Sequence, residues 1–120
     1  MAAPKVFESE YRFLEILWEN EPVNSTRLVG LCKEKLGWTK ATTYTVIRRL
    51  AERGVLRNED AIVASLVSKD EVQAAEITEL VEKRFGGSLP AFIAAFTKHE
   101  SLSAQEAQHL RSLVETHREE

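Results

Sequence analysis

The sequence has a single cysteine, so it cannot form a disulfide within the chain, and it lacks cysteine pairs at metal-binding spacing. This residue, Cys32, lies in an apolar helical pattern, and we expect it to be a small core residue rather than a reactive thiol. No apolar run approaches the roughly 18 residues that a membrane-spanning helix needs. The first residues also lack the apolar segment of a secretory signal. We therefore expect a cytoplasmic protein that is not inserted in a membrane.

Signatures of catalysis and of cofactor binding are also scarce. The only histidines are His99, His109 and His117, all near the C-terminus. His109 and His117 are two helical turns apart, too far to share a metal ion within one chain. No glycine-rich phosphate loop, serine elbow or paired-acid signature occurs in the sequence. We therefore predict no enzymatic activity, no cofactor and no metal, with a site shared between two chains through His99 or His109 as the alternative.

Positive charge is concentrated in one short segment. Residues 39–57 carry five basic side chains and one acidic side chain, a net charge of +4 in a chain whose net charge is −3. The rest of the sequence therefore carries −7. A nucleic-acid-binding protein needs a basic face only where it touches the nucleic acid. This division of charge indicates a polyanion-binding segment in an otherwise acidic chain.

Apolar residues at three- and four-residue steps predict two helices before this segment. Ser9 is the candidate N-cap of the first helix, which ends before Pro22 because proline cannot continue it. Either Asn24 or Ser25 can cap the second helix. Gly37 ends the second helix, since glycine tolerates the left-handed conformation of a helix C-terminus.

A third helix and a small hairpin follow. Thr39 is the predicted N-cap of this helix, and Gly54 ends it. The segments "VLRN" (55–58) and "AIVASLV" (61–67) are β-branched and apolar, with a polar turn between them. Three helices followed by a hairpin predict a mainly α fold with a winged helix-turn-helix domain over residues 1–67.

Residues 68–120 return to a helical pattern, and we predict a C-terminal helical dimerisation domain there. Ser68, Ser88 and Ser103 are candidate N-caps of three helices, and the first of these ends at "GG" (86–87). The apolar residues are too few for a core of their own, so a second copy of the chain is the simplest partner. The predicted dimer contacts are Val81, Phe85, Leu89, Phe92, Ile93, Phe96, Leu110 and Leu113.

The third predicted helix combines threonines with basic residues. Free N–H groups at a helix start favour phosphate, and donors projecting from a helix in the major groove read base edges. We expect Thr42, Thr43 and Tyr44 to approach bases. The residues expected to serve the helix start and the DNA backbone are Thr39, Lys40, Thr45, Arg48, Arg49 and Arg53. The alternative is that the three arginines form a solvated face, or pair with Glu52 or with carboxylates of the first helix.

Three segments together resemble the penicillinase-repressor family of BlaI/MecI-type winged-helix regulators: "SEYRFLEILW", "GWTKATTYTVIRRLAERGVL" and "FGGSLPAFIAAFTKHESLSAQEAQHLRSLV". The resemblance implies a homodimeric transcriptional repressor that binds a pseudo-palindromic operator in double-stranded DNA, ahead of resistance or stress genes. The residues that match the family's motif are Trp38, Thr39, Thr42, Thr45, Arg49 and Leu50. By this resemblance Thr42, Thr45 and Arg49 would contact DNA, whereas Trp38 and Leu50 would be structural.

The resemblance also implies induction through cleavage by a membrane metalloprotease receptor. The matching bond is Ala95–Phe96, with alanine where the family often has asparagine.

Glu59 and Asp60 stand at the predicted wing turn, so we expect the wing to add little affinity for DNA. The alternative function is a winged-helix module that binds proteins without sequence-specific DNA binding. Such a module would need an apolar exposed face on the third helix, where this sequence has arginines.

Overall fold

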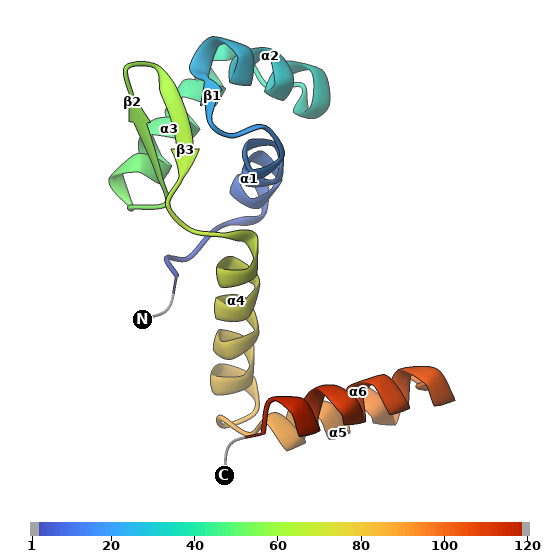
Figure 1. Ribbon diagram of the computed structural model, residues 1–120. Coiled ribbons are helices and arrows are strands. Elements are labelled where there is room, and N and C mark those ends of the chain that lie inside the picture. The colour runs from blue at the N-terminus through green and yellow to red at the C-terminus, as the bar shows by residue number, and fades with distance from the viewer. Residues whose placement is uncertain (1–2, 119–120) are drawn as a thin grey trace. The chain divides into compact units, whose positions relative to one another are not determined.

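The computed structural model describes residues 3–118. Helices and strands follow one another along the chain as α1 (Glu8–Asn20), β1 (Val23–Asn24), α2 (Ser25–Leu36), α3 (Lys40–Glu52), β2 (Leu56–Glu59), β3 (Ile62–Ser65), α4 (Lys69–Arg84), α5 (Leu89–His99) and α6 (Ala104–Thr116) (Figure 1). The chain divides into two compact units, the first extending to Glu79 and the second beginning at Leu80. The domain boundary expected between residues 67 and 68 stays a prediction. No helix of the described residues is long and apolar enough to cross a membrane.

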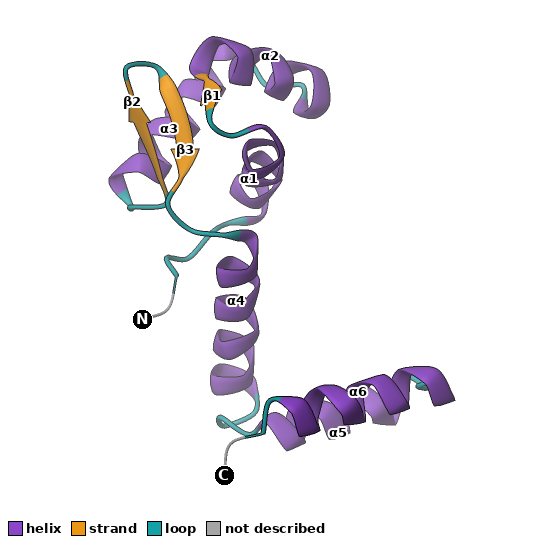
Figure 2. Ribbon diagram, viewed as in Figure 1, coloured by secondary structure: helices purple, strands orange, loops and turns teal. Residues whose placement is uncertain are grey.

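The predicted mainly helical fold with a winged helix-turn-helix is confirmed. Helices α1, α2 and α3 are followed by the hairpin β2–β3, in which β2 lies against α3 and β3 against α1 (Figure 2). The hairpin belongs to a three-stranded antiparallel sheet of order β1-β3-β2. Val63 of β3 pairs with Val23 on one side and with Asn58 on the other. Strand β1 was not predicted, and it ties the loop after α1 to the wing.

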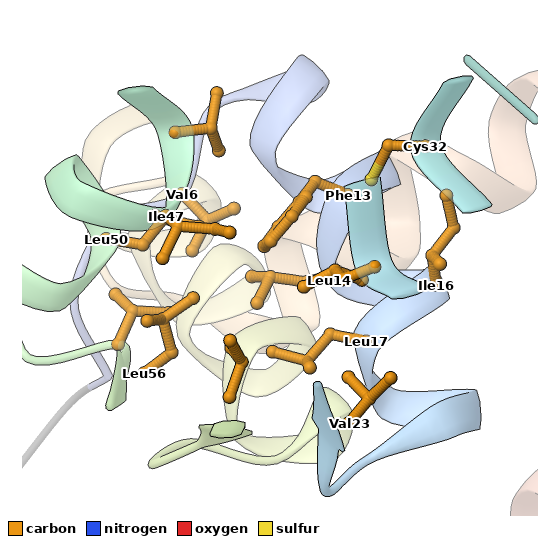
Figure 3. Packing of buried hydrophobic residues seen from close by; sticks show 14 of the residues in the cluster. Val6, Phe13, Leu14, Ile16, Leu17, Val23, Cys32, Ile47, Leu50 and Leu56 are labelled. Atoms are coloured by element: carbon orange, nitrogen blue, oxygen red, sulfur yellow. The ribbon is translucent and has the colours of Figure 1, made fainter. Parts of the chain in front are cut away.

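One apolar core holds these elements together. Phe13, Leu14 and Leu17 of α1 are fully buried. In Figure 3 they lie between the side chains of α3, including Leu50, and Cys32 of α2. Burial of a large apolar side chain contributes roughly 1.5–3 kcal/mol, so this cluster dominates the stability of the first unit. The prediction that Cys32 is a core residue is confirmed.

Local capping fixes where the helices begin. The Oδ1 atom of Asn24 accepts a hydrogen bond from the N–H of Thr26 at 2.8 Å, so Asn24 rather than Ser25 is the N-cap of α2. The turn between α2 and α3 requires a left-handed residue, and Gly37 supplies it with φ of 71°. The N-cap prediction for Ser9 is wrong. Helix α1 begins at Glu8, and the backbone N–H of Phe7 donates to the side chain of Glu10 at 3.0 Å.

The predicted caps of the last three helices are confirmed. Ser68 and Glu71 exchange hydrogen bonds at the start of α4, as Ser103 and Glu106 do at the start of α6. The hydroxyl of Ser88 caps α5 by accepting from the backbone at 3.1 Å. Reciprocal bonds of this kind satisfy backbone donors that a helix start otherwise leaves unpaired.

Candidate nucleic-acid interface

Helix α3 presents one polar face to solvent. Lys40, Thr42, Arg48 and Arg49 are exposed on it, and Thr45 is half-buried. The opposite side packs into the core through Val46, Ile47 and Leu50. Within residues 3–118, no ion pair joins Lys40, Arg48 or Arg49 to a carboxylate. The charges on this face are therefore available to an external anion.

The start of α3 carries several hydrogen-bond donors. The Oγ1 atom of Thr39 accepts from the backbone N–H of Thr42 at 3.1 Å and donates its own proton to the Oγ1 of Thr42 at 3.0 Å. Because the Thr42 hydroxyl accepts this bond, its proton remains available for an outside acceptor. The backbone N–H groups of Lys40 and Ala41 precede the first intrahelical bond and favour a bound anion. Phosphate or the acceptor edge of a base fits this arrangement.

The prediction that Thr43 approaches bases is wrong. Its side chain is fully buried, and its hydroxyl donates to the backbone oxygen of Thr39 at 3.0 Å. The physical reason is helical phase: Thr43 precedes Val46, Ile47 and Leu50 at three- and four-residue steps, so it shares their buried face. Thr43 is a structural residue of the helix start.

Tyr44 lies where α2 and α3 meet. Its ring packs against the core, and its hydroxyl is 3.3 Å from the hydroxyl of Ser25, which is itself buried. Ser25 is the first residue of α2, so this bond links the starts of the two helices. A base contact by Tyr44 stays a prediction, and the hydrogen bond gives the side chain a structural role that the sequence analysis missed.

Arg53 ties the end of α3 to α1. Its Nη1 is 2.7 Å from Oε2 of Glu10, and its Nη2 donates to the backbone oxygen of Lys5. Glu10 is buried, with 2% of its side chain exposed, so the guanidinium of Arg53 neutralises a carboxylate that is shielded from solvent. A contact between Arg53 and the DNA backbone stays a prediction, and these two bonds give the side chain a structural role. Pairing with a first-helix carboxylate, the alternative reading, applies to Arg53 but to neither Arg48 nor Arg49.

Opposing effects set the pKa of Glu10. Burial raises it, but hydrogen bonds from Arg53 and from the N–H of Phe7, together with the charges of Arg53 and Arg49, more than offset this effect. The pKa of Glu10 therefore lies below its usual value, and the side chain is ionised at neutral pH. The sequence contained a signal for its burial, since Glu10 precedes Phe13, Leu14 and Leu17 at helical spacing.

The wing turns through two residues with positive φ, Asp60 at 52° and Ala61 at 65°. Such two-residue turns match the twist of the flanking strands. Glu59 and Asp60 are exposed at the tip, where they oppose phosphate. The expectation that the wing adds little affinity for DNA stays a prediction.

In the second unit, apolar side chains remain in contact with solvent. Phe85 and Phe92 pack edge to face, with ring centroids 5.5 Å apart, and Val81 is buried. The other predicted dimer contacts are between 42% and 54% exposed, namely Leu89, Ile93, Phe96, Leu110 and Leu113. No residue of α5 or α6 is fully buried. Among the described residues, no group of three or more His, Cys, Asp or Glu side chains is arranged to hold a metal ion.

The sequence profile of the penicillinase repressor family matches residues 7–116. The chain belongs to the penicillinase repressor family. It is 20% identical over 119 residues to the penicillinase repressor of Bacillus licheniformis, covering 96% of this chain and 93% of the relative. It is 22% identical to the methicillin resistance regulatory protein MecI of Staphylococcus aureus strain Mu50, covering 92% and 93% of the two chains.

A solved structure of the family supports the same fold. The solution structure of the monomeric form of Bacillus licheniformis BlaI, in complex with the blaP half-operator, matches with a TM-score of 0.52 and 17% identity. The match covers 59% of this chain and 93% of that one. Members of the penicillinase repressor family are transcriptional repressors rather than enzymes. The resemblance inferred from the three sequence segments is therefore confirmed.

Proposed function

We propose that this penicillinase repressor family member represses transcription by binding a pseudo-palindromic operator in double-stranded DNA as a homodimer. The observation that carries the proposal is the exposed face of α3, where Thr42, Thr45, Arg48 and Arg49 combine donors with charges that have no carboxylate partner among residues 3–118. The proposed targets are resistance or stress genes, and the proposed location of the protein is the cytoplasm. The relatives named as penicillinase and methicillin-resistance regulators support this choice.

The two kinds of contact have different roles on α3. Thr42, whose hydroxyl proton is free, would donate to a base edge in the major groove. Arg49, exposed on the same helix, would bind phosphate and fix the register without reading sequence. Two such helices at a fixed spacing would occupy successive major grooves and block polymerase. A protein-binding module is the weaker alternative, because none of the large apolar side chains of α3 is exposed.

DNA binding is tested with a duplex selected from a random pool by the full-length protein, about 30 base pairs or roughly three helical turns long. Its dissociation constant is measured by fluorescence anisotropy from about 50 to 200 mM KCl, with a scrambled duplex for comparison. Arg49→Ala should weaken binding to both duplexes and flatten the salt dependence. Thr42→Ala should cost about 1–3 kcal/mol on the selected duplex only.

The matched control is Arg12→Ala. Arg12 is an exposed arginine of α1 whose surface pair with Glu8 spans 3.5 Å, and it has no proposed DNA contact. If Arg12→Ala and Arg49→Ala have equal effects on the salt slope, the assignment of α3 is wrong. If Thr42→Ala loses the same affinity for the selected and the scrambled duplex, Thr42 does not read bases.

The homodimer is supported by the apolar side chains that α5 and α6 leave exposed in the single chain. Phe92→Asp should produce monomers with weak operator affinity, because a carboxylate would have to be buried in the interface. Sedimentation velocity measures this outcome. The control is Ser112→Asp, which adds the same charge at an exposed polar position of α6. A Phe92→Asp protein that remains dimeric would place Phe92 outside the interface.

The proposal also includes induction by a membrane metalloprotease that cleaves the Ala95–Phe96 bond. Ala95 and Phe96 both lie inside α5, where backbone groups are hydrogen-bonded within the helix. Cleavage would therefore require local unfolding of α5. Co-expression with a candidate receptor, followed by mass spectrometry of the fragments, would test for a cut after Ala95, and an intact chain after induction would exclude it.

A further inference from the structure

The residues before α1 form a short N-terminal arm, residues 3–7, that is attached to the end of α3. Arg53 donates to the backbone oxygen of Lys5, and its guanidinium carbon is 5.5 Å from the centroid of the Phe7 ring. The ammonium of Lys5 lies at the same distance from this ring. The backbone N–H of Phe7 is in turn bound to Glu10. Two of these interactions, both from Arg53, join the arm to the end of α3, and the bond to Glu10 joins it to α1.

The arm has a buried and an exposed part: Val6 belongs to the apolar core, whereas Lys5 and Phe7 lie at the surface. Phe7 is 56% exposed, although an aromatic ring of this size gains most by burial. Lys5 is also exposed, and no ion pair joins it to a carboxylate among residues 3–118. The ring instead has two cations near its face, an arrangement that is favourable because the face of an aromatic ring carries partial negative charge. The exposed part of the arm is thus an aromatic residue flanked by positive charge.

The charges around the arm favour an anionic partner. The carboxylate of Glu10 is buried and neutralised by Arg53, and that of Glu8 lies 3.5 Å from the guanidinium of Arg12. Lys5 and Arg49 form no ion pair with a carboxylate among residues 3–118. Arg49 precedes Arg53 by one helical turn, and Arg53 donates to the backbone oxygen of Lys5. The arm therefore lies beside the C-terminal end of α3, about one helical turn from Arg49.

We propose that Lys5 contacts a backbone phosphate of the operator beside the groove that α3 enters, with Phe7 and Arg53 as positioning residues for the arm. This inference rests on the proposed function, because it extends the DNA contacts of α3. The sugar–phosphate backbone is the partner that fits, since Lys5 and Arg49 carry positive charge in a chain with a net charge of −3 and both lie near Arg53. The tether through Arg53 sets the position of Lys5 before DNA binds, so less entropy is lost on association.

The experiment measures anisotropy of the selected duplex with full-length Lys5→Gln between about 50 and 200 mM KCl. Loss of one phosphate contact makes the slope of log K against log salt less steep by about 0.9 for each bound subunit. Lys5→Gln should therefore bind more weakly than the unaltered protein at the lower salt concentration. The dissociation constant of Lys5→Gln divided by that of the unaltered protein should be about 3.5-fold smaller, for each bound subunit, at the higher salt concentration than at the lower one. Lys5→Arg should restore the slope, because it restores the charge.

Lys98→Gln serves as the control, since it removes one exposed positive charge from α5, where no DNA contact is proposed. The arm contact is overturned if Lys5→Gln keeps the slope of the unaltered protein, or if Lys98→Gln changes the slope by the same amount. Either result leaves the proposed function intact, provided that the unaltered protein binds with a steep salt dependence. If the unaltered protein shows no salt-dependent binding, the proposed function itself fails.

Discussion

Replacing Arg53 by methionine should destabilise the winged-helix unit, because it leaves the carboxylate of Glu10 buried without its counter-charge. Removing one partner of a buried ion pair costs about 3–5 kcal/mol. The side chain of Arg53 is 31% exposed, so water screens part of the interaction and we expect about 2–3 kcal/mol. In a unit of this size 1 kcal/mol shifts the melting temperature by about 4–8 °C. Arg53→Met should therefore lower it by roughly 10–20 °C.

The effect should depend on pH in a defined direction. The pKa of Glu10 lies below the value of 4.5 that is usual for glutamate. A carboxyl group whose pKa is lowered by folding stabilises the protein above its unfolded-state pKa, and this contribution is lost as the pH falls through the folded-state pKa. The difference in the free energy of unfolding between the unaltered protein and Arg53→Met should have its full size at neutral pH. It should shrink as the pH falls below the usual glutamate pKa of 4.5.

Urea unfolding, followed by circular dichroism and tryptophan fluorescence, measures both effects. Glu10→Gln and the double variant Glu10→Gln/Arg53→Met complete a thermodynamic cycle, since glutamine keeps the shape of the side chain without its charge. The cost of Arg53→Met should be smaller in the Glu10→Gln background. A cost below about 0.5 kcal/mol, the range of ordinary surface substitutions, would refute the reasoning. A larger cost that does not change with pH would equally contradict it.

Three further predictions concern single positions. Ala61→Gly should stabilise the protein by roughly 0.5 kcal/mol in urea unfolding. It removes the cost of a left-handed alanine, about 1–2 kcal/mol, but glycine raises the entropy of the unfolded chain, which offsets about 0.4–1 kcal/mol. No gain in stability would show that the turn relaxes. Burial raises the pKa of the Cys32 thiol to about 11, although a hydrogen bond with Thr43 lowers it. Cys32 should therefore react with a thiol reagent at pH 8 only as the protein unfolds. Rapid labelling of the folded protein would contradict the burial of Cys32. Val72→Ala should cost about 1.5–2.5 kcal/mol, because Val72 is buried in the core of the first unit; unchanged stability would exclude the start of α4 from that core.

Local rules predicted most helix boundaries correctly. Asn24, Thr39, Ser88 and Ser103 cap their helices through hydrogen bonds to residues two or three positions ahead, so the sequence alone contains both partners. Gly37 ends α2 for an equally local reason. The exception is α1, where Glu10 accepts from the N–H of Phe7 and the helix begins before the predicted cap.

Strand β1 was not predicted, and the pairing of Arg53 with the first helix was only an alternative, because both features depend on distant partners. Strand β1 has only two residues and forms because Val23 pairs with Val63. A strand this short has no hydrophobic periodicity from which it could be predicted. The partner of Arg53 lies 43 positions earlier in the chain, at Glu10, and is brought near only when α1 packs against α3. The error at Thr43 was avoidable, since its spacing from Val46 already indicated the buried face.

Nuclear magnetic resonance of the full-length protein with the selected duplex tests the central claim most directly, because it reports which residues meet the DNA. The account predicts that the largest changes in backbone amide shifts fall on residues 39–49, with Thr42 and Arg49 among them. Titration with the scrambled duplex should give smaller changes at Thr42 and similar ones at Arg49. Amide shifts on α3 that stay unchanged while the duplex is bound elsewhere on the chain would contradict the account.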